Sequence, residues 1–167
     1  MRGVGLGLRG VARGVEVTRD GFKVTGIDVR EHTVGQLNAG ISYVQDVPTD
    51  VVRHYVENGL FSATTDFSVS AELDTVNIAV PTPLRKTKDP DMSFVVSAAQ
   101  EIAKYAHPGL LVILESTTYP GTTDELLLPM LEKSGLKVGH DIFLCFSPER
   151  VDPGKPKFHT IKIPQAV

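Results

Sequence analysis

The chain has 167 residues, the usual length of one domain and too short for two sizeable ones. Hydrophobic residues make up 41% and charged residues 22%, which allows a packed core and argues against general disorder. Seventeen basic residues against twenty acidic ones give a formal charge of −3 with no Lys/Arg run, so a nucleic-acid binder is not expected.

The chain opens with a short candidate strand at residues 2–4, followed by the segment Gly5-Leu6-Gly7-Leu8-Arg9-Gly10, which fits the pattern GxGxxG. In such a turn the first glycine permits the tight bend, the second lets the backbone approach a diphosphate, and the third allows close helix packing. A helix is expected next, because the apolar residues recur at helical spacing. These are Leu8, Val11, Ala12 and Val15. Arg9 and Arg13 fall on the opposite, polar face of that helix. The N–H groups at its start would attract the diphosphate.

The next predicted strand covers residues 22–28 and ends in Asp28, 18 residues after Gly10. This is the expected place for a carboxylate that accepts both hydroxyls of an adenosine ribose. An anion there also repels a 2′-phosphate, so NAD is favoured over NADP. The alternative is a structural glycine turn with Asp28 as an ordinary cap at the strand end.

The remaining chain alternates between strands and helices. Further strands are predicted at residues 60–63, 75–80, 110–114 and 142–146. Helices are predicted at residues 50–57, with Thr49 as N-cap and Gly59 at the end, at residues 93–106, and at residues 122–133, closed by Gly135. This alternation predicts a single α/β domain of the Rossmann type, with a doubly wound, mostly parallel, six-stranded sheet and helices on both faces. The apolar runs are too short to span a bilayer.

Two residue types that often carry chemistry give weaker signals. The single cysteine, Cys145, lies inside a predicted central strand, where cysteine is usually a small buried hydrophobe, and it fits a reducing cytoplasm. The histidines are scattered without the spacing of metal ligands, so no metal site is expected. They are His32, His54, His107, His140 and His159.

Several segments match a known family in order along nearly the whole chain. They are GFKVTGIDV (21–29), VGQLNAGIS (34–42), VPTPL (80–84), PDMSFV (90–95), ESTTYPGTT (115–123) and SPERVDPG (147–154). With them the sequence resembles the UDP-glucose/GDP-mannose dehydrogenase family, and within it the UDP-N-acetylglucosamine 6-dehydrogenases. The pair ESTTYPGTT and SPER is far more specific than a glycine-rich loop.

The resemblance implies a role for each matching position. The loop from Gly5 to Gly10 would bind the NAD diphosphate, and Asp28 the adenosine ribose. Thr82 would line the cofactor site, Thr117 would lie near the nicotinamide and hold a catalytic water, and Glu149 would assist proton transfer at the sugar. From the residues alone, Thr117 is a hydroxyl that satisfies backbone groups, a role that can coexist with the first, and Glu149 is an exposed loop residue. Asp28, Thr82 and Thr117 each follow a predicted strand, and ligands bind at that edge of an open α/β sheet.

The family reaction oxidises a primary alcohol of a nucleotide sugar to a carboxylate with two NAD, through a cysteine thiolate. Relatives are more than twice as long and form homodimers or larger assemblies. The resemblance places their catalytic Cys and Lys, and most of the nucleotide-sugar site, beyond residues 151–167, which read as a linker after a cofactor domain at 1–150. The expected function is therefore the NAD-binding portion of a nucleotide-sugar 6-dehydrogenase, acting on a UDP-N-acetylhexosamine or UDP-glucose and inactive alone.

Two alternatives remain. One is a non-catalytic remnant, or a module that needs a separate partner chain. The other is a self-contained oxidoreductase of another class, but a short-chain dehydrogenase would need a Tyr-x-x-x-Lys pair, and none of the tyrosines is followed by Lys at that spacing.

Overall fold

The computed structural model describes residues 8–45, 47–86 and 89–148 of the chain. The strands are β1 (Val24–Ile27), β2 (Phe61–Thr64), β3 (Thr75–Ile78), β4 (Leu111–Leu114) and β5 (Phe143–Phe146). The α-helices are α1 (Leu8–Arg19), α2 (Glu31–Asn38), α3 (Thr49–Glu57), α4 (Ser93–Lys104) and α5 (Leu128–Leu131). Short 3-10 helices are η1 (Phe67–Glu72) and η3 (Glu132–Ser134), and η2 (Thr122–Leu127) is π-helical. The predicted α/β class and every strand predicted from residue 22 onward are confirmed.

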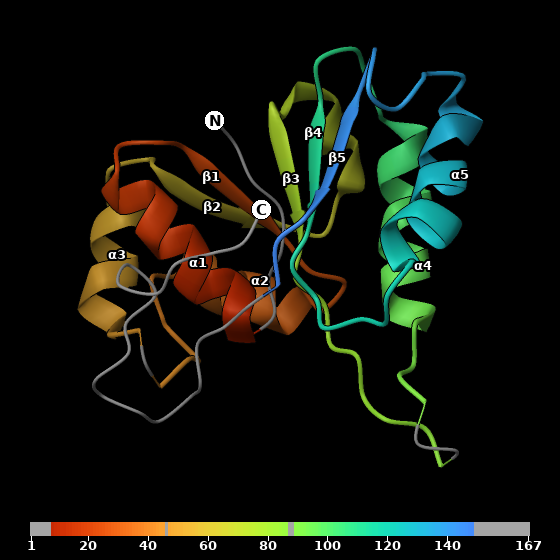
Figure 1. Cartoon of the computed structure of the whole chain (residues 1–167). Coiled ribbons are helices and arrows are strands. Elements are labelled where there is room, and N and C mark those ends of the chain that lie inside the picture. The colour runs from red at the N-terminus through yellow and green to blue at the C-terminus, as the bar shows by residue number, and fades with distance from the viewer. Residues whose placement is uncertain (1–7, 46, 87–88, 149–167) are drawn as a thin grey trace.

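The strands that the structure describes form two parallel sheets, where the sequence predicts one six-stranded sheet (Figure 1). One sheet has the order β1-β2 and the other β3-β4-β5. In a doubly wound sheet the first strand lies between the second and the fourth, which here are β1 and β3. The predicted first strand, residues 2–4, lies outside the described residues, so the five strands that the structure describes fall into two groups.

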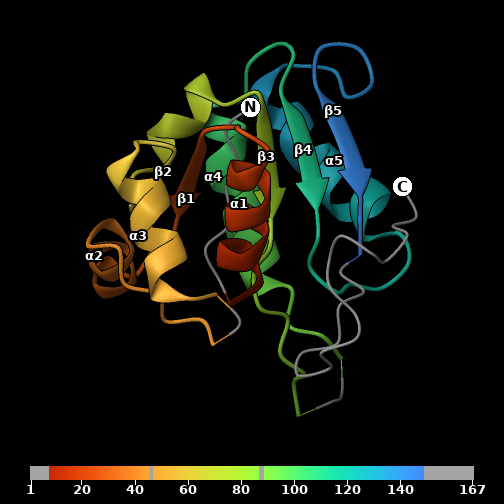
Figure 2. The same cartoon turned by 90° about the vertical axis from the view of Figure 1, so that its left-hand side faces the viewer.

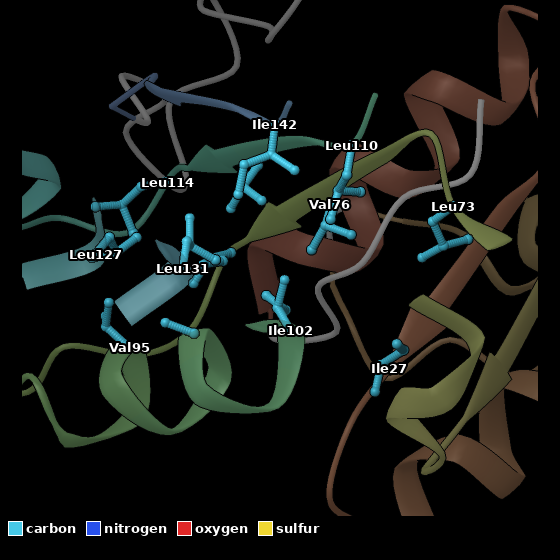
Figure 3. Packing of buried hydrophobic residues seen from close by; sticks show 13 residues of the cluster. Ile27, Leu73, Val76, Val95, Ile102, Leu110, Leu114, Leu127, Leu131 and Ile142 are labelled. Carbon is cyan, nitrogen blue, oxygen red and sulfur yellow. The ribbon is translucent and has the colours of Figure 1, made fainter. Parts of the chain in front are cut away.

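The three-stranded sheet is built around one apolar cluster. Alternate residues of its strands point to the face that α4 and α5 cover, because side chains alternate along a strand. Figure 3 shows Val76, Leu114 and Ile142 meeting Ile102 of α4 and Leu131 of α5. Turned by 90°, the molecule shows β3, β4 and β5 running in the same direction with these helices behind them (Figure 2).

The two-stranded sheet packs against α1, α2 and α3 through a second cluster. Val11 and Val15 of α1 are buried there, as their helical spacing predicts. Glycine lowers helix propensity, but Gly14 is explained by packing. A Cβ atom at this position would lie 3.0 Å from Cε2 of Phe61 in β2. The glycine therefore lets α1 approach the sheet closely.

The outer edge of β2 is closed by a side chain. The Asn38 Nδ2 group donates to the Ala63 carbonyl at 2.8 Å, and Asn38 Oδ1 accepts from the Ala63 N–H at 2.8 Å. The amide thus replaces the backbone pairs that a further strand would supply. Among the described residues, every helix is too short or too polar to cross a membrane.

Two local expectations are corrected by the structure. Thr49 is the first residue of α3 and Pro48 is its N-cap, so the Thr49 hydroxyl instead accepts from the Ser42 N–H at 3.2 Å. The helix predicted at residues 122–133 splits into η2, α5 and η3. Pro129 explains the split, since it has no N–H to close a regular turn, and the Leu128 N–H bonds the Thr123 carbonyl instead.

Candidate functional site

The loops that follow β1, β3 and β4 leave from the same side of the molecule, the lower side in Figure 1. Asp28 comes directly after β1, and its N–H donates to the Thr64 carbonyl at 3.2 Å, which continues the ladder by one residue. Only 6% of the Asp28 side chain is exposed. The predicted ribose carboxylate is therefore held rigidly at the end of the strand.

The Asp28 carboxylate is already occupied by a neighbouring residue. The Arg30 backbone N–H donates to Oδ1 at 2.9 Å, and the Arg30 guanidinium donates through Nε to Oδ1 at 3.1 Å and through Nη2 to Oδ2 at 2.9 Å. The backbone bond is an Asx turn that leads into α2, with Arg30 as the N-cap. The hydrogen bond to Asp28 raises the pKa of Arg30, against a smaller opposing effect of burial. The negative charge that the sequence assigns to this position is thus paired with a positive one.

Tyr43 lies beside this ion pair. Its hydroxyl is buried and has no hydrogen-bond partner among the described residues. Burial, and after it the charge of Asp28, raise the pKa of Tyr43 to about 12, while Arg30 acts in the opposite direction. A buried hydroxyl without a partner costs stability, so it marks a polar position that this structure leaves unsatisfied.

A second group of polar residues follows β3 and β4. The Ser116 hydroxyl donates toward the carbonyls of Ile78, at 3.2 Å, and Val80, at 2.9 Å, and accepts from the Val80 N–H at 2.9 Å. Ser116 therefore fixes the chain after β3 against the chain after β4. Thr82 is half-buried and Thr117 is exposed, and each comes within two residues of this tie. Thr117 is thus accessible from solvent, and the family resemblance implies a position for it near the nicotinamide.

Glu115 forms a buried polar cluster one residue before Ser116. Its Oε1 atom accepts from Asn77 Nδ2 at 3.2 Å and lies 3.5 Å from Arg13 Nε in α1. Arg13, which the sequence places on the polar face of this helix, has two thirds of its side chain covered and forms this ion pair. Burial, and after it the charge of Glu115, raise the pKa of Cys145, which argues against a thiolate nucleophile there.

The structure describes some of the predicted site residues and not others. Asp28 directly follows β1, and Thr82 and Thr117 lie in the loops after β3 and β4. Leu8, Arg9 and Gly10 open α1, and Gly10 is buried. Gly5, Leu6, Gly7 and Glu149 lie outside the described residues, so the diphosphate turn and the sugar-side acid stay predictions. Within the described part of the chain, no group of three or more His, Cys, Asp or Glu could hold a metal ion.

Sequence reasoning did not find Arg30, Tyr43 or Ser116. Ser116 could have been found, since it lies within the motif ESTTYPGTT directly after a strand. Arg30 follows the strand-end acid by two residues, the spacing of an Asx turn, but a sequence shows no side-chain direction. Tyr43 lies in a loop, where nothing indicates burial.

Comparison with known proteins identifies the family of the chain. Residues 2–167 match the model of the UDP-glucose/GDP-mannose dehydrogenase family, NAD binding domain. The chain belongs to this family. The match is to the NAD binding domain of the family, as the resemblance implied.

Named relatives share the sequence over a limited part of their length. The UDP-N-acetyl-D-glucosamine 6-dehydrogenase of Pseudomonas aeruginosa is 36% identical over 152 residues, which is 90% of this chain and 35% of that protein. The UDP-N-acetyl-D-mannosamine dehydrogenase of Escherichia coli is 35% identical over 167 residues, covering 95% of this chain and 39% of that one.

A solved structure shows the same fold. The UDP-D-ManNAc dehydrogenase of Pyrococcus horikoshii superposes with a TM-score of 0.85 at 31% identity, over 92% of this chain and 37% of that one. The chain therefore spans little more than a third of the length of the relatives that it matches.

Proposed function

We propose that this family domain binds NAD across the ends of β1, β3 and β4, with the adenosine ribose at Asp28 and the nicotinamide near Thr82 and Thr117. The supporting observation is Asp28, a buried carboxylate fixed at the end of β1 in a domain that matches an NAD-binding family. A charged acceptor for two hydroxyls gives stronger hydrogen bonds than a neutral one.

We further propose that the domain serves the oxidation of the C6 alcohol of a UDP-N-acetylhexosamine or UDP-glucose to a carboxylate. NAD would supply the hydride acceptor. Thr117, exposed after β4, would hold a water near the reacting carbon, and Glu149 would assist proton transfer at the sugar. The names of the relatives, dehydrogenases of UDP-N-acetyl sugars, support this substrate class.

The oxidation would also need catalytic groups that lie outside the part of the relatives aligned with this chain. The resemblance assigns the nucleophilic cysteine to the part of the relatives outside the aligned third, and the raised pKa of Cys145 makes it a poor substitute. We therefore expect the 167 residues alone to bind NAD without turning over UDP-N-acetylglucosamine.

Calorimetric titration of NAD into the purified chain tests the proposal. Asp28→Asn should weaken NAD binding about tenfold, since a charged acceptor is replaced by a neutral one. Asp20→Asn, at an exposed position just after α1, removes the same charge and should leave the affinity unchanged. Absence of NAD binding to the folded chain, or equal effects of the two substitutions, would overturn the assignment.

A further inference from the structure

The carboxylate of Asp28 has too little acceptor capacity left for a ribose. A carboxylate offers about four acceptor positions in total. Arg30 already uses three of them, two on Oδ1 and one on Oδ2. Two ribose hydroxyls need two positions, so they can bind only if the Arg30 side chain gives up at least one of its bonds.

The two partners differ in their freedom to move. The Asp28 side chain is 6% exposed and is also fixed by the Arg30 backbone N–H, whereas 60% of the Arg30 side chain is exposed. A mostly exposed guanidinium can change rotamer and be solvated by water, whereas the buried carboxylate cannot move out without losing its backbone hydrogen bond. A ligand would therefore displace the guanidinium and leave the carboxylate in place.

A displaced Arg30 guanidinium would lie next to the position of the ribose. Its planar fork of donors matches a phosphate group, which it can bind in a bidentate manner. The pairing with Arg30 also makes the local charge neutral, so the repulsion that would exclude a 2′-phosphate is weakened. The buried Tyr43 hydroxyl, which interacts electrostatically with both groups, adds a donor without a partner among the described residues.

We infer that Arg30 selects the cofactor at this site: it competes with the ribose of NAD for Asp28 and provides a binding position for the 2′-phosphate of NADP. This inference rests on the proposed dinucleotide binding. It adds that the chain accepts NADP as well as NAD, and that one side chain moves the two affinities in opposite directions.

The test compares the dissociation constants of NAD and NADP for the full 167-residue chain and three variants. Arg30→Gln removes the charge and the competing fork. It should bind NADP at least about tenfold more weakly and NAD up to about fivefold more tightly. Arg30→Lys keeps the charge without the fork and should lose less NADP affinity than Arg30→Gln. Arg19→Gln, at an exposed position at the end of α1, is the matched control and should change neither constant.

The outcomes separate the inference from the function on which it rests. If the folded wild-type chain binds neither dinucleotide, the proposed function fails and the inference fails with it. If the chain binds NAD but the ratio of the NADP and NAD constants is the same in wild type and Arg30→Gln, only the inference is overturned. A ratio that changes equally in Arg19→Gln would also overturn it, because the effect would then come from net charge alone.

Discussion

The Nε atom of Arg13 in α1 lies 3.5 Å from the Oε1 atom of Glu115, directly after β4. Because α1 packs on the two-stranded sheet and β4 is the centre of the three-stranded sheet, this ion pair joins the two sheets. Asn77 of β3 donates to the same oxygen. The helix α1, whose first N–H groups are expected to attract the diphosphate, is thus attached to the strand that leads to Thr117.

The charge of Glu115 should control the reactivity of Cys145. Glu115→Gln removes one of the two causes that raise the pKa of the thiol, so more thiolate forms at a given pH and the reaction with Ellman's reagent becomes faster. Burial, the larger cause, remains, so the rate should stay below that of the chain in denaturant. Cys145 is the only cysteine, which makes the assay unambiguous. Glu101→Gln on α4 is the control, and an equal acceleration there would contradict the explanation.

Ser116→Ala should destabilise the fold by about 1–3 kcal/mol, because the Val80 N–H loses its acceptor and two carbonyls lose a donor. Urea unfolding followed by circular dichroism measures this difference. Ser62→Ala, at an exposed position in β2, should stay within about 0.5 kcal/mol of wild type. Similar losses in the two variants would mean that the tie between β3 and β4 is not what stabilises this region.

Gly40→Ala should be much more damaging than Gly59→Ala, although both glycines have a left-handed backbone. Gly40 has φ +71°, and a Cβ atom there would lie 2.9 Å from the Arg53 Cα atom in α3. Gly59 has φ +67° and nothing within 4 Å. We expect a loss of about 1 kcal/mol at Gly59, from backbone conformation alone, and at least about 2 kcal/mol more at Gly40. Thermal unfolding of the two variants gives the comparison, and equal midpoints would contradict it.

Tyr43 should make the fold sensitive to alkali. Its pKa is about 12 in the folded chain and near 10 when exposed, so the unfolded state loses the proton first as the pH rises. The stabilisation is complete below pH 10 and is lost progressively as the pH rises toward 12. Tyr43→Phe should remove this loss and, at neutral pH, should equal wild type or exceed it by up to about 1 kcal/mol, since it removes a buried hydroxyl without a described partner.

Urea unfolding at neutral pH and near pH 11 tests the Tyr43 prediction. Absorbance at 295 nm, compared between wild type and Tyr43→Phe, isolates the ionisation of this phenol. A phenol that titrates near its ordinary value of 10 would contradict the burial argument.

The sequence predicted the elements whose local signals agree with the tertiary fold. The strands could be located because each is a short run of β-branched or apolar residues between turns, and Gly135 does end its helix with a left-handed backbone. α2 was not predicted, since Gly35 lowers its helix propensity and only Thr33 and Leu37 are buried. Its formation depends on packing against the rest of the fold, which a local pattern does not show.

The candidate site was predicted only as far as backbone position determines it. A strand end places Asp28 at the edge of the sheet, and this part is confirmed. The partners of the charged groups were missed because they depend on side-chain direction and on pairs that are distant in sequence. Arg30 folds back onto Asp28, and Arg13 reaches Glu115 from another element. The prediction that Asp28 repels a 2′-phosphate therefore assumed an unpaired negative charge, which Arg30 neutralises in the structure.

Ile27 belongs to β1, yet its side chain is buried in the cluster of the three-stranded sheet, near Leu73 (Figure 3). The residue that precedes Asp28 is thus held by side chains of the other half of the molecule. A dinucleotide bound from Asp28 to Thr117 would contact both halves of the molecule next to this cluster. Its binding energy would then oppose separation of the two halves more than melting of either one.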